Sequence, residues 1–250
     1  MGAERAGDEN LRRRPSTSPY DRIAELYDPW SRSVVEDVDF YVDLAVESGG
    51  PVVELGVGTG RIAIPTVRAG IRVIGIDSSQ GMLDVCRRRA AEDRVLTPLD
   101  LRLGDIAAPP VHERVPLVTC PFRAYLHLDT DTNRLRALGA ARDLLAPGGR
   151  FVFDVFHPAP DDVAATHGRW IEREPEIFER AEWNEADRTL TLAVRGPDGA
   201  GTLRLAWISA GEWHDLLVRA GFDVEALYGW FDRRPYAGGE DSIWVARRLD

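Results

Sequence analysis

The 250-residue sequence contains no lysine, so all 31 of its basic residues are arginine. That absence excludes a lysine Schiff base, a pyridoxal-phosphate anchor and a phosphate-loop lysine. Cysteine is scarce as well, and 2 cysteines with 5 scattered histidines predict neither a disulfide framework nor a metal site. No apolar run approaches the ~20 residues that span a bilayer, so we expect no membrane segment.

Acidic residues outnumber basic ones, 41 to 31, which gives a formal net charge of −10. Because binding to phosphates needs a concentrated basic face, this balance argues against a nucleic-acid partner. Residues 1–19 are polar and rich in arginine, with no apolar core of a secretory signal, and are predicted to be a disordered tail. We expect a cytoplasmic protein with a single domain over residues 20–250.

Strand and helix patterns alternate along most of the chain, with short turns between them. Apolar or alternating runs predict strands over 51–55, 71–77, 99–103, 115–120, 151–156, 222–228 and 242–247. Helical spacing of apolar residues predicts helices over 61–69, 80–92, 130–145 and 210–220. This alternation is typical of an α/β fold, a Rossmann-like parallel sheet with helices on both faces.

Two segments depart from this alternation. Residues 20–50 contain two amphipathic helices, predicted over 20–30 and 36–48. Residues 157–208 contain alternating apolar residues on both sides of a Gly-Pro-Asp-Gly turn at 196–199, which predicts an antiparallel hairpin, with a third strand over 176–183. We interpret 157–208 as an antiparallel β insertion into the domain, because about 50 residues bury little surface on their own.

The strongest chemical signal is the glycine-rich turn at 54–60, Glu-Leu-Gly-Val-Gly-Thr-Gly, between the first strand and its helix. Glycines at such a turn let the backbone approach a ligand closely. Asp77 ends the next strand about 20 residues later, where an acid can accept the hydroxyls of a ribose. Arg61 stands where a dinucleotide motif has its third glycine, which favours a nucleoside without a pyrophosphate.

From about Tyr20 to the end, the chain resembles the class I S-adenosylmethionine-dependent methyltransferases. Five motifs in the family's order carry the resemblance, at 53–60, 74–79, 81–83, 104–106 and 144–149. One small departure is Val57, where the family often has Cys or Ala. The resemblance implies S-adenosylmethionine as the cofactor, S-adenosylhomocysteine as its product, and residues 20–50 as a helical lid.

The resemblance also implies which residues bind the cofactor. They lie in the lid and at the strand ends: Tyr27, Glu54, Gly56, Gly58, Gly60, Asp77, Ser78, Met82, Gly104, Asp105, Ile106, Cys120 and Pro121. Within this set the three loop glycines border the methionine moiety and Glu54 fixes their loop. Asp77 binds the ribose, and Ser78 and Met82 flank the adenine. The acids of this set are expected to surround the cationic sulfonium.

Catalytic candidates lie in two places. Tyr20 and Tyr27 belong to a Tyr-Asp-x-Ile-Ala-x-x-Tyr-Asp motif in the lid, and by resemblance both line the site. Phe122 and His127 follow the fourth strand, at the sheet edge where open α/β folds bind ligands. His127 is the best-placed base because the pKa of a free imidazole lies near neutrality, although a purely structural histidine fits the sequence nearly as well.

Asp154 and His157 follow at the end of the fifth strand, at the same edge. Either could contact the substrate, although a structural role is favoured for each. Arg233, Arg234 and Tyr236, before the last strand, are interpreted as part of a solvated loop.

Orientation dominates methyl transfer from a sulfonium, because the methyl group is already activated. An attacking hydroxyl also needs a base, whereas an amine needs only to be neutral. Our hypothesis is N-methylation of a small molecule, resembling enzymes that act on amino sugars and antibiotic intermediates. Alternatives are O-methylation with His127 as base, a non-catalytic cofactor-binding module and, least favoured, RNA modification. The hairpin is a candidate surface for a homo-oligomer.

Overall fold

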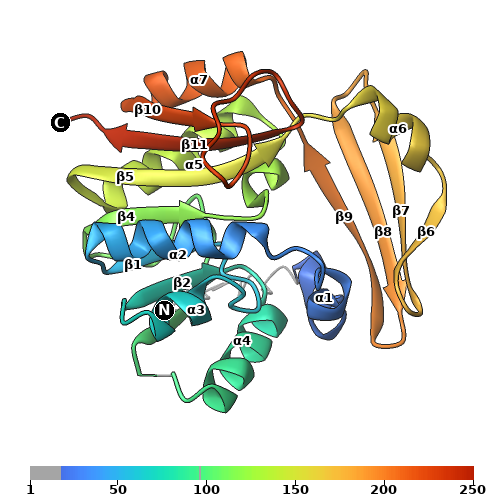
Figure 1. Cartoon of the computed structure of the whole chain (residues 1–250), viewed down its shortest axis with the longest axis horizontal. Helices are drawn as coiled ribbons and strands as arrows, with labels where there is room; N and C mark the ends of the chain where they lie inside the picture. Colours follow the sequence, from blue (N-terminus) through green and yellow to red (C-terminus); the bar gives the residue numbers. More distant parts are fainter. Residues whose placement is uncertain (1–17, 96) are drawn as a thin grey trace, which may run out of the picture.

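The computed structural model describes residues 18–95 and 97–250, so most of the predicted N-terminal tail lies outside it. Its main feature is a seven-stranded sheet in the order β10-β11-β5-β4-β1-β2-β3 (Figure 1). The strands are β1 (Val52–Leu55), β2 (Val73–Asp77), β3 (Leu99–Leu103), β4 (Val115–Cys120), β5 (Leu145–Phe156), β10 (Phe222–Tyr228) and β11 (Asp241–Arg248). The predicted α/β fold is therefore confirmed.

The five strands from β3 to β5 are parallel, whereas β11 pairs antiparallel with both β5 and β10. The sheet is therefore mixed: the predicted parallel arrangement holds for these five strands, and β11 runs opposite to all the others. All residues of β1 and β2 are buried, as expected for strands covered on both faces. The order of the parallel strands reverses between β1 and β4. In open α/β sheets, ligands bind at this switch point, outside the carboxyl ends of the strands.

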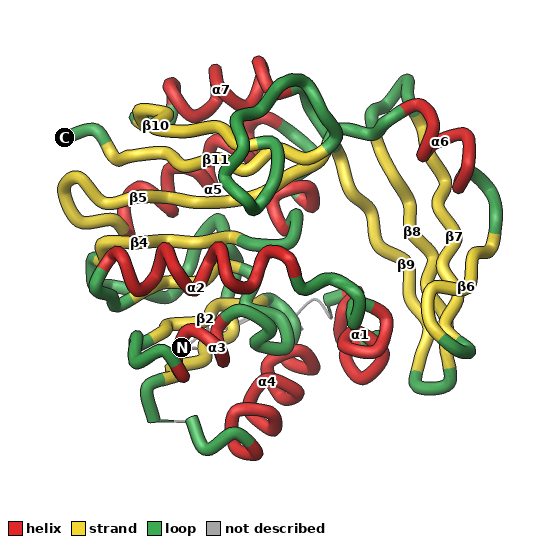
Figure 2. The backbone as a smooth tube through the Cα atoms, in the orientation of Figure 1, coloured by secondary structure: helices red, strands yellow, loops and turns green. Residues whose placement is uncertain are grey.

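Helices cover both faces of this sheet (Figures 1 and 2). They are α2 (Glu36–Ser48), α3 (Ala63–Arg68), α4 (Gln80–Glu92), α5 (Asp131–Leu144) and α7 (Ala210–Arg219). Successive residues of β1 point to opposite faces, so Val52 packs in the cluster of α2 while Val53 packs in the larger core with α5 and α7. Ser79 caps α4 by accepting a hydrogen bond from the Met82 amide.

The N-terminal segment forms two helical pieces where the periodicity predicts one. A 3₁₀ turn, η1 (Pro19–Arg22), precedes α1 (Ala24–Trp30), and the break falls at Ile23, whose φ of −122° is not helical. Pro19 begins η1, one residue before the predicted boundary of the tail. The break turns Tyr20 toward the carboxyl ends of the strands, as described below.

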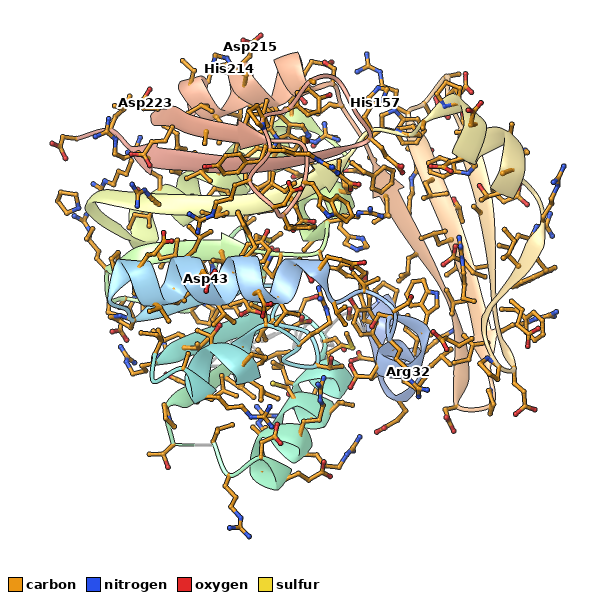
Figure 3. The ribbon with its side chains drawn as sticks, viewed as in Figure 1. Arg32, Asp43, His157, His214, Asp215 and Asp223 are labelled. Carbon is orange, nitrogen blue, oxygen red and sulfur yellow. The ribbon has the colours of Figure 1, made fainter. Side chains whose placement is uncertain are left out.

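The predicted insertion forms a second sheet, in the order β6-β7-β8-β9, which stands beside the carboxyl ends of the main strands (Figure 1). Its elements are α6 (Pro160–Thr166), β6 (Trp170–Glu174), β7 (Ile177–Asn184), β8 (Thr189–Gly196) and β9 (Gly199–Ala206). The pattern predicts β7, β8 and β9 but misses α6 and β6, which bury little of their surface. Figure 3 labels His157, near the point where the chain leaves β5 for this sheet.

The lid segment and the insertion share their own small core. Its members, all buried, are Ile23, Leu26, Ile177, Val194 and Leu203. The hairpin of β8 and β9 approaches the lid backbone so closely that a Cβ on Gly199 would lie 2.5 Å from the carbonyl oxygen of Arg22. The lid therefore packs on the insertion through apolar contacts.

Within the described part of the chain, no helix combines the length and the apolar character needed to cross a membrane.

Candidate active site

A cavity of about 400 Å³ lies at the carboxyl ends of β1, β2 and β4, under η1 and α1. This volume falls in the range of small-molecule sites. Its lining consists of Ser18, Pro19, Tyr20, Tyr27, Gly56, Gly58, Asp77, Ser78, Met82, Asp105, Ile106, Pro121, Phe122, Ala124, His127 and Leu128. The structure therefore brings most of the predicted site residues together in one place.

The glycine-rich turn and the end of β2 form the inner wall of the cavity. Gly58 has a φ of 56°, a backbone conformation that favours glycine, and its amide donates a 2.9 Å hydrogen bond to Asp77 Oδ2. Asp77 Oδ1 accepts a 2.8 Å bond from the Ser79 amide. These bonds fix the carboxylate, and each oxygen keeps a lone pair for a ligand hydroxyl. Burial raises the pKa of Asp77, while the two amides oppose that shift.

Four predicted cofactor residues do not line the cavity. Gly60 and Gly104 are packing positions: a Cβ on Gly60 would lie 2.6 Å from Cys86 Sγ, and one on Gly104 would collide with Pro110. Cys120 is fully buried in the main core, just below the cavity.

Glu54 is the fourth of these residues, and it is buried under the glycine turn. Burial raises the pKa of Glu54 to about 8, so this carboxyl is neutral at pH 7. The contribution of Glu54 to the charge around a cationic cofactor, which its place in the motif predicts, stays a prediction. Asp77 and Asp105 are the carboxylates that line the cavity.

Two aspartates of the lid motif attach the lid to the inner wall. Asp21 Oδ1 accepts a 2.6 Å hydrogen bond from Ser79 Oγ and a 3.0 Å bond from the Gly81 amide, both at the start of α4. These contacts place Tyr20, the residue before Asp21, at the cavity.

Asp28 makes the second attachment, seven residues further along the lid, in α1. Its Oδ1 accepts a 2.5 Å bond from Thr59 Oγ1 in the glycine turn, and Arg89 forms an ion pair with it at 3.0 Å. Tyr27, the residue before Asp28, also lines the cavity. In the Tyr-Asp repeats of the motif, each tyrosine faces the cavity and each aspartate fastens the lid.

His127 lies between the lid and the insertion. Its Nε2 is 2.8 Å from the Tyr20 hydroxyl, and its Nδ1 is 3.0 Å from the backbone carbonyl of Arg204 in β9. Because a carbonyl only accepts, Nδ1 carries a proton, and in the neutral ring Nε2 accepts from Tyr20. Burial lowers the pKa of His127, which favours that neutral form. The insertion therefore fixes the tautomer that leaves Nε2 as the basic atom.

Aromatic rings close the outer wall. Tyr27 makes edge-to-face contacts with both Tyr20 and Phe122, with ring centroids 5.9 Å and 6.4 Å apart. The Arg61 guanidinium stacks on Phe122 at 4.7 Å and is itself paired with the buried carboxylate of Asp37. Arg61, which replaces the third glycine of a dinucleotide motif, thus supports this wall.

The sequence analysis missed four lining residues: Ser18, Pro19, Ala124 and Leu128. None has side-chain chemistry that stands out in a sequence. Ala124 begins and Leu128 follows η2 (Ala124–His127), a 3₁₀ turn that was not predicted.

Comparison with known proteins agrees with this architecture. Residues 52–149 match the methyltransferase domain family. An uncharacterized methyltransferase of Geobacillus kaustophilus is 33% identical over 135 residues, which span 54% of this chain and 60% of that protein. A demethylmenaquinone methyltransferase of Streptomyces avermitilis is 28% identical over 219 residues, covering 80% of this chain and 88% of that one.

Solved structures match over nearly the whole chain. The CcbJ methyltransferase of Streptomyces caelestis superposes with a TM-score of 0.80 at 26% identity, covering 94% of this chain and 99% of its own. CalS10, an amino pentose methyltransferase of Micromonospora echinaspora involved in calicheamicin biosynthesis, gives a TM-score of 0.65 at 21% identity, with 91% and 97% coverage. The match to CalS10 shows that the two proteins share a fold.

Proposed function

Because the chain belongs to the class I S-adenosylmethionine-dependent methyltransferases, we propose that it transfers a methyl group to an amine nitrogen of a small molecule. One observation carries this proposal. A single cavity combines a fixed carboxylate suited to a ribose, Asp77, with a neutral histidine whose basic nitrogen faces a lid tyrosine. The first feature suits a nucleoside cofactor and the second suits proton removal from a nucleophile.

The residues of the inner wall fit this cofactor. The ribose hydroxyls would be accepted by Asp77, and the adenine would lie among Ser78, Met82 and Ile106. When bound, S-adenosylmethionine supplies a methyl group already activated by its sulfonium. The turn around Gly56 and Gly58 leaves room for the backbone to approach the remaining part of the cofactor.

The outer wall suits a cationic centre and an amine. Tyr20, Tyr27 and Phe122 gather here, and the faces of such aromatic rings stabilise a nearby positive charge. The lining contains Asp77 and Asp105 and, within the described residues, no arginine. A carboxylate or phosphate substrate would find no arginine in this lining to neutralise it, whereas a cationic amine would meet a lining whose fixed charges are negative.

His127 would make the substrate amine reactive. A protonated amine has no lone pair, and Nε2 of the neutral imidazole can accept its proton, directly or through the Tyr20 hydroxyl. Once protonated, the imidazole still donates from Nδ1 to the Arg204 carbonyl, so the ring keeps its orientation.

Neighbouring proteins add support of a weaker kind. CalS10 is described as an amino pentose methyltransferase and KedS8 as a sugar N-methyltransferase, and both share this fold. An amino sugar or a related secondary metabolite is accordingly our first substrate class. O-methylation is the second candidate, because an acceptor nitrogen on His127 would equally activate a hydroxyl.

Turnover against matched compounds tests the proposal. Amino sugars and their hydroxyl analogues, which differ only at the nitrogen, are incubated with the protein and S-adenosylmethionine, and products are detected by mass. We expect a product heavier by one CH₂ from the amine of a pair. A product from the hydroxyl analogue alone would favour O-methylation, and tight S-adenosylhomocysteine binding without any product would favour a non-catalytic module.

A further inference from the structure

The segment that carries Phe122 and His127 has an unusual backbone. Phe122 and Arg123 follow each other with φ values of 56° and 64°, in the left-handed region that side chains with a Cβ rarely adopt. Arg123 also directly precedes η2, the turn that ends at His127. Two such residues in succession are strained and persist only where their surroundings hold them.

A buried carboxylate holds them here. Asp154, at the end of β5, accepts a 2.8 Å hydrogen bond from the Phe122 amide on Oδ1 and a 3.1 Å bond from the Arg123 amide on Oδ2. Tyr41 of α2 donates a third, 2.6 Å bond to Oδ1. Consecutive amides that converge on one anion form a backbone nest, and in this protein the anion is a side chain of the same chain.

The sheet explains why Asp154 can reach this backbone. Cys120, the last residue of β4, pairs with Phe153 on the neighbouring parallel strand, so Asp154 lies level with the residues that follow β4. Its side chain is 5% exposed and does not line the cavity. Asp154 touches neither the proposed cofactor nor the proposed substrate site.

We propose that Asp154 is a positioning residue: its carboxylate fixes the left-handed turn at Phe122 and Arg123, and through it the placement of Phe122 and His127 in the cavity. This inference rests on the proposed function. A neutral group at position 154 would leave the Arg123 amide without its acceptor, and the start of η2 would relax. Since misplacing a reacting group by about 1 Å can cost a hundredfold in rate, turnover should depend on this carboxylate.

The surroundings of Asp154 make its charge titratable near neutrality. Burial and the Asp37 carboxylate raise the pKa of Asp154 to about 6, against the hydrogen bond from Tyr41, the Arg123 guanidinium and the Phe122 amide. Two further ionisable groups act on the same region: Arg61 and Cys120. The nest therefore loses its anion below about pH 6, and activity should fall there.

The primary test is the variant Asp154→Asn. The amide keeps an oxygen for Tyr41 and Phe122 but turns its NH₂ toward the Arg123 amide. We expect kcat/KM to fall about 10- to 100-fold, with a much smaller change in S-adenosylhomocysteine affinity by calorimetry. Hydrogen exchange should speed up in the peptide that spans 121–127. Wild-type kcat/KM and exchange in this variant would overturn the proposal.

A second variant, Tyr41→Phe, keeps the proposal testable if Asp154→Asn does not fold. Without the hydroxyl, the carboxylate retains the nest but loses a donor, so the pKa of Asp154 should rise further. The acid limb of the pH profile of kcat/KM should lie at higher pH in the variant than in the wild type. Both proteins are measured with the same substrate, so the ionisation of the substrate affects both profiles equally. An unmoved limb would contradict the inference. If the wild type itself shows no turnover, the proposed function fails instead, so the two failures are distinguishable.

Discussion

The two walls of the cavity are built in different ways. The inner wall uses residues close in sequence: the glycine turn, the end of β2 and the start of α4, joined by the bonds of Asp77 to Gly58 and Ser79. The outer wall joins distant segments, as in the contacts of His127 with Tyr20 in the lid and with Arg204 in the insertion. We infer that the inner wall binds the cofactor, while the outer wall sets the chemistry and the substrate.

The largest expected effect is on the outer wall, in the variant His127→Ala. Loss of a general base typically costs 10²- to 10⁴-fold, so turnover should fall by about that factor. Affinity for S-adenosylhomocysteine should change only a few-fold, because the inner wall is intact. Steady-state kinetics measures the turnover, and calorimetry measures the affinity for S-adenosylhomocysteine. Full turnover in this variant would remove His127 from the mechanism.

The variant Asp77→Ala affects the inner wall and should show the opposite pattern. It removes the proposed ribose acceptor and leaves the Gly58 and Ser79 amides without a partner, so cofactor affinity should fall by about 100-fold. Asp84→Ala is a matched control, since Asp84 is an exposed acid on the neighbouring α4. Calorimetry with S-adenosylhomocysteine measures both, and equal affinities in the two variants would contradict the assignment.

A third prediction concerns the buried neutral carboxyl beneath the inner wall. The pKa of Glu54 is raised to about 8 in the folded protein, so the stability of the protonated form is present at low pH and lost as the pH rises through about 8. The loss begins above the ordinary pKa of 4.5 and is nearly complete at pH 8, so between pH 6 and pH 8 this group should lower the free energy of unfolding by roughly 2 kcal/mol. In urea denaturation, the Glu54→Gln variant should not show this pH-dependent decrease in the free energy of unfolding. The same pH dependence in the variant and the wild type would show that the pKa of Glu54 is not raised.

The smallest effect is expected where the walls meet. Asp28→Ala removes the bonds to Thr59 and Arg89 that fasten the lid, and we expect the KM for the cofactor to rise roughly 3- to 10-fold. Glu25→Ala is the matched control on the same helix, because its ion pair with Arg88 is exposed and should contribute almost nothing. A KM that changes equally in both variants would argue against a specific role for Asp28.

The comparison also explains what the sequence could predict. The inner wall follows from local rules, since the glycine spacing and Asp77 belong to one strand-turn-helix-strand unit. Glu54, Gly60 and Gly104 do not line the cavity, because the position of a residue in a motif says nothing about its burial. The motifs therefore predicted the order of the fold and most of the residues that line the cavity.

The outer wall could be predicted only in part. The lid motif identified Tyr20 and Tyr27, but the roles of its aspartates appear only when α4 packs beside the lid. The break at Ile23 depends on packing against the insertion and leaves no trace in the periodicity. Asp154 was assigned a structural role because a sequence does not show that its side chain reaches the backbone 31 and 32 residues earlier.

The most direct test of the account is the destination of the methyl group. The protein is incubated with ¹³C-methyl S-adenosylmethionine and the best amino sugar of the panel, and the product is examined by NMR. The account predicts a labelled carbon bonded to nitrogen, in a yield that His127→Ala strongly reduces. A labelled carbon on oxygen, or no labelled product from any amine although the cofactor binds, would contradict it.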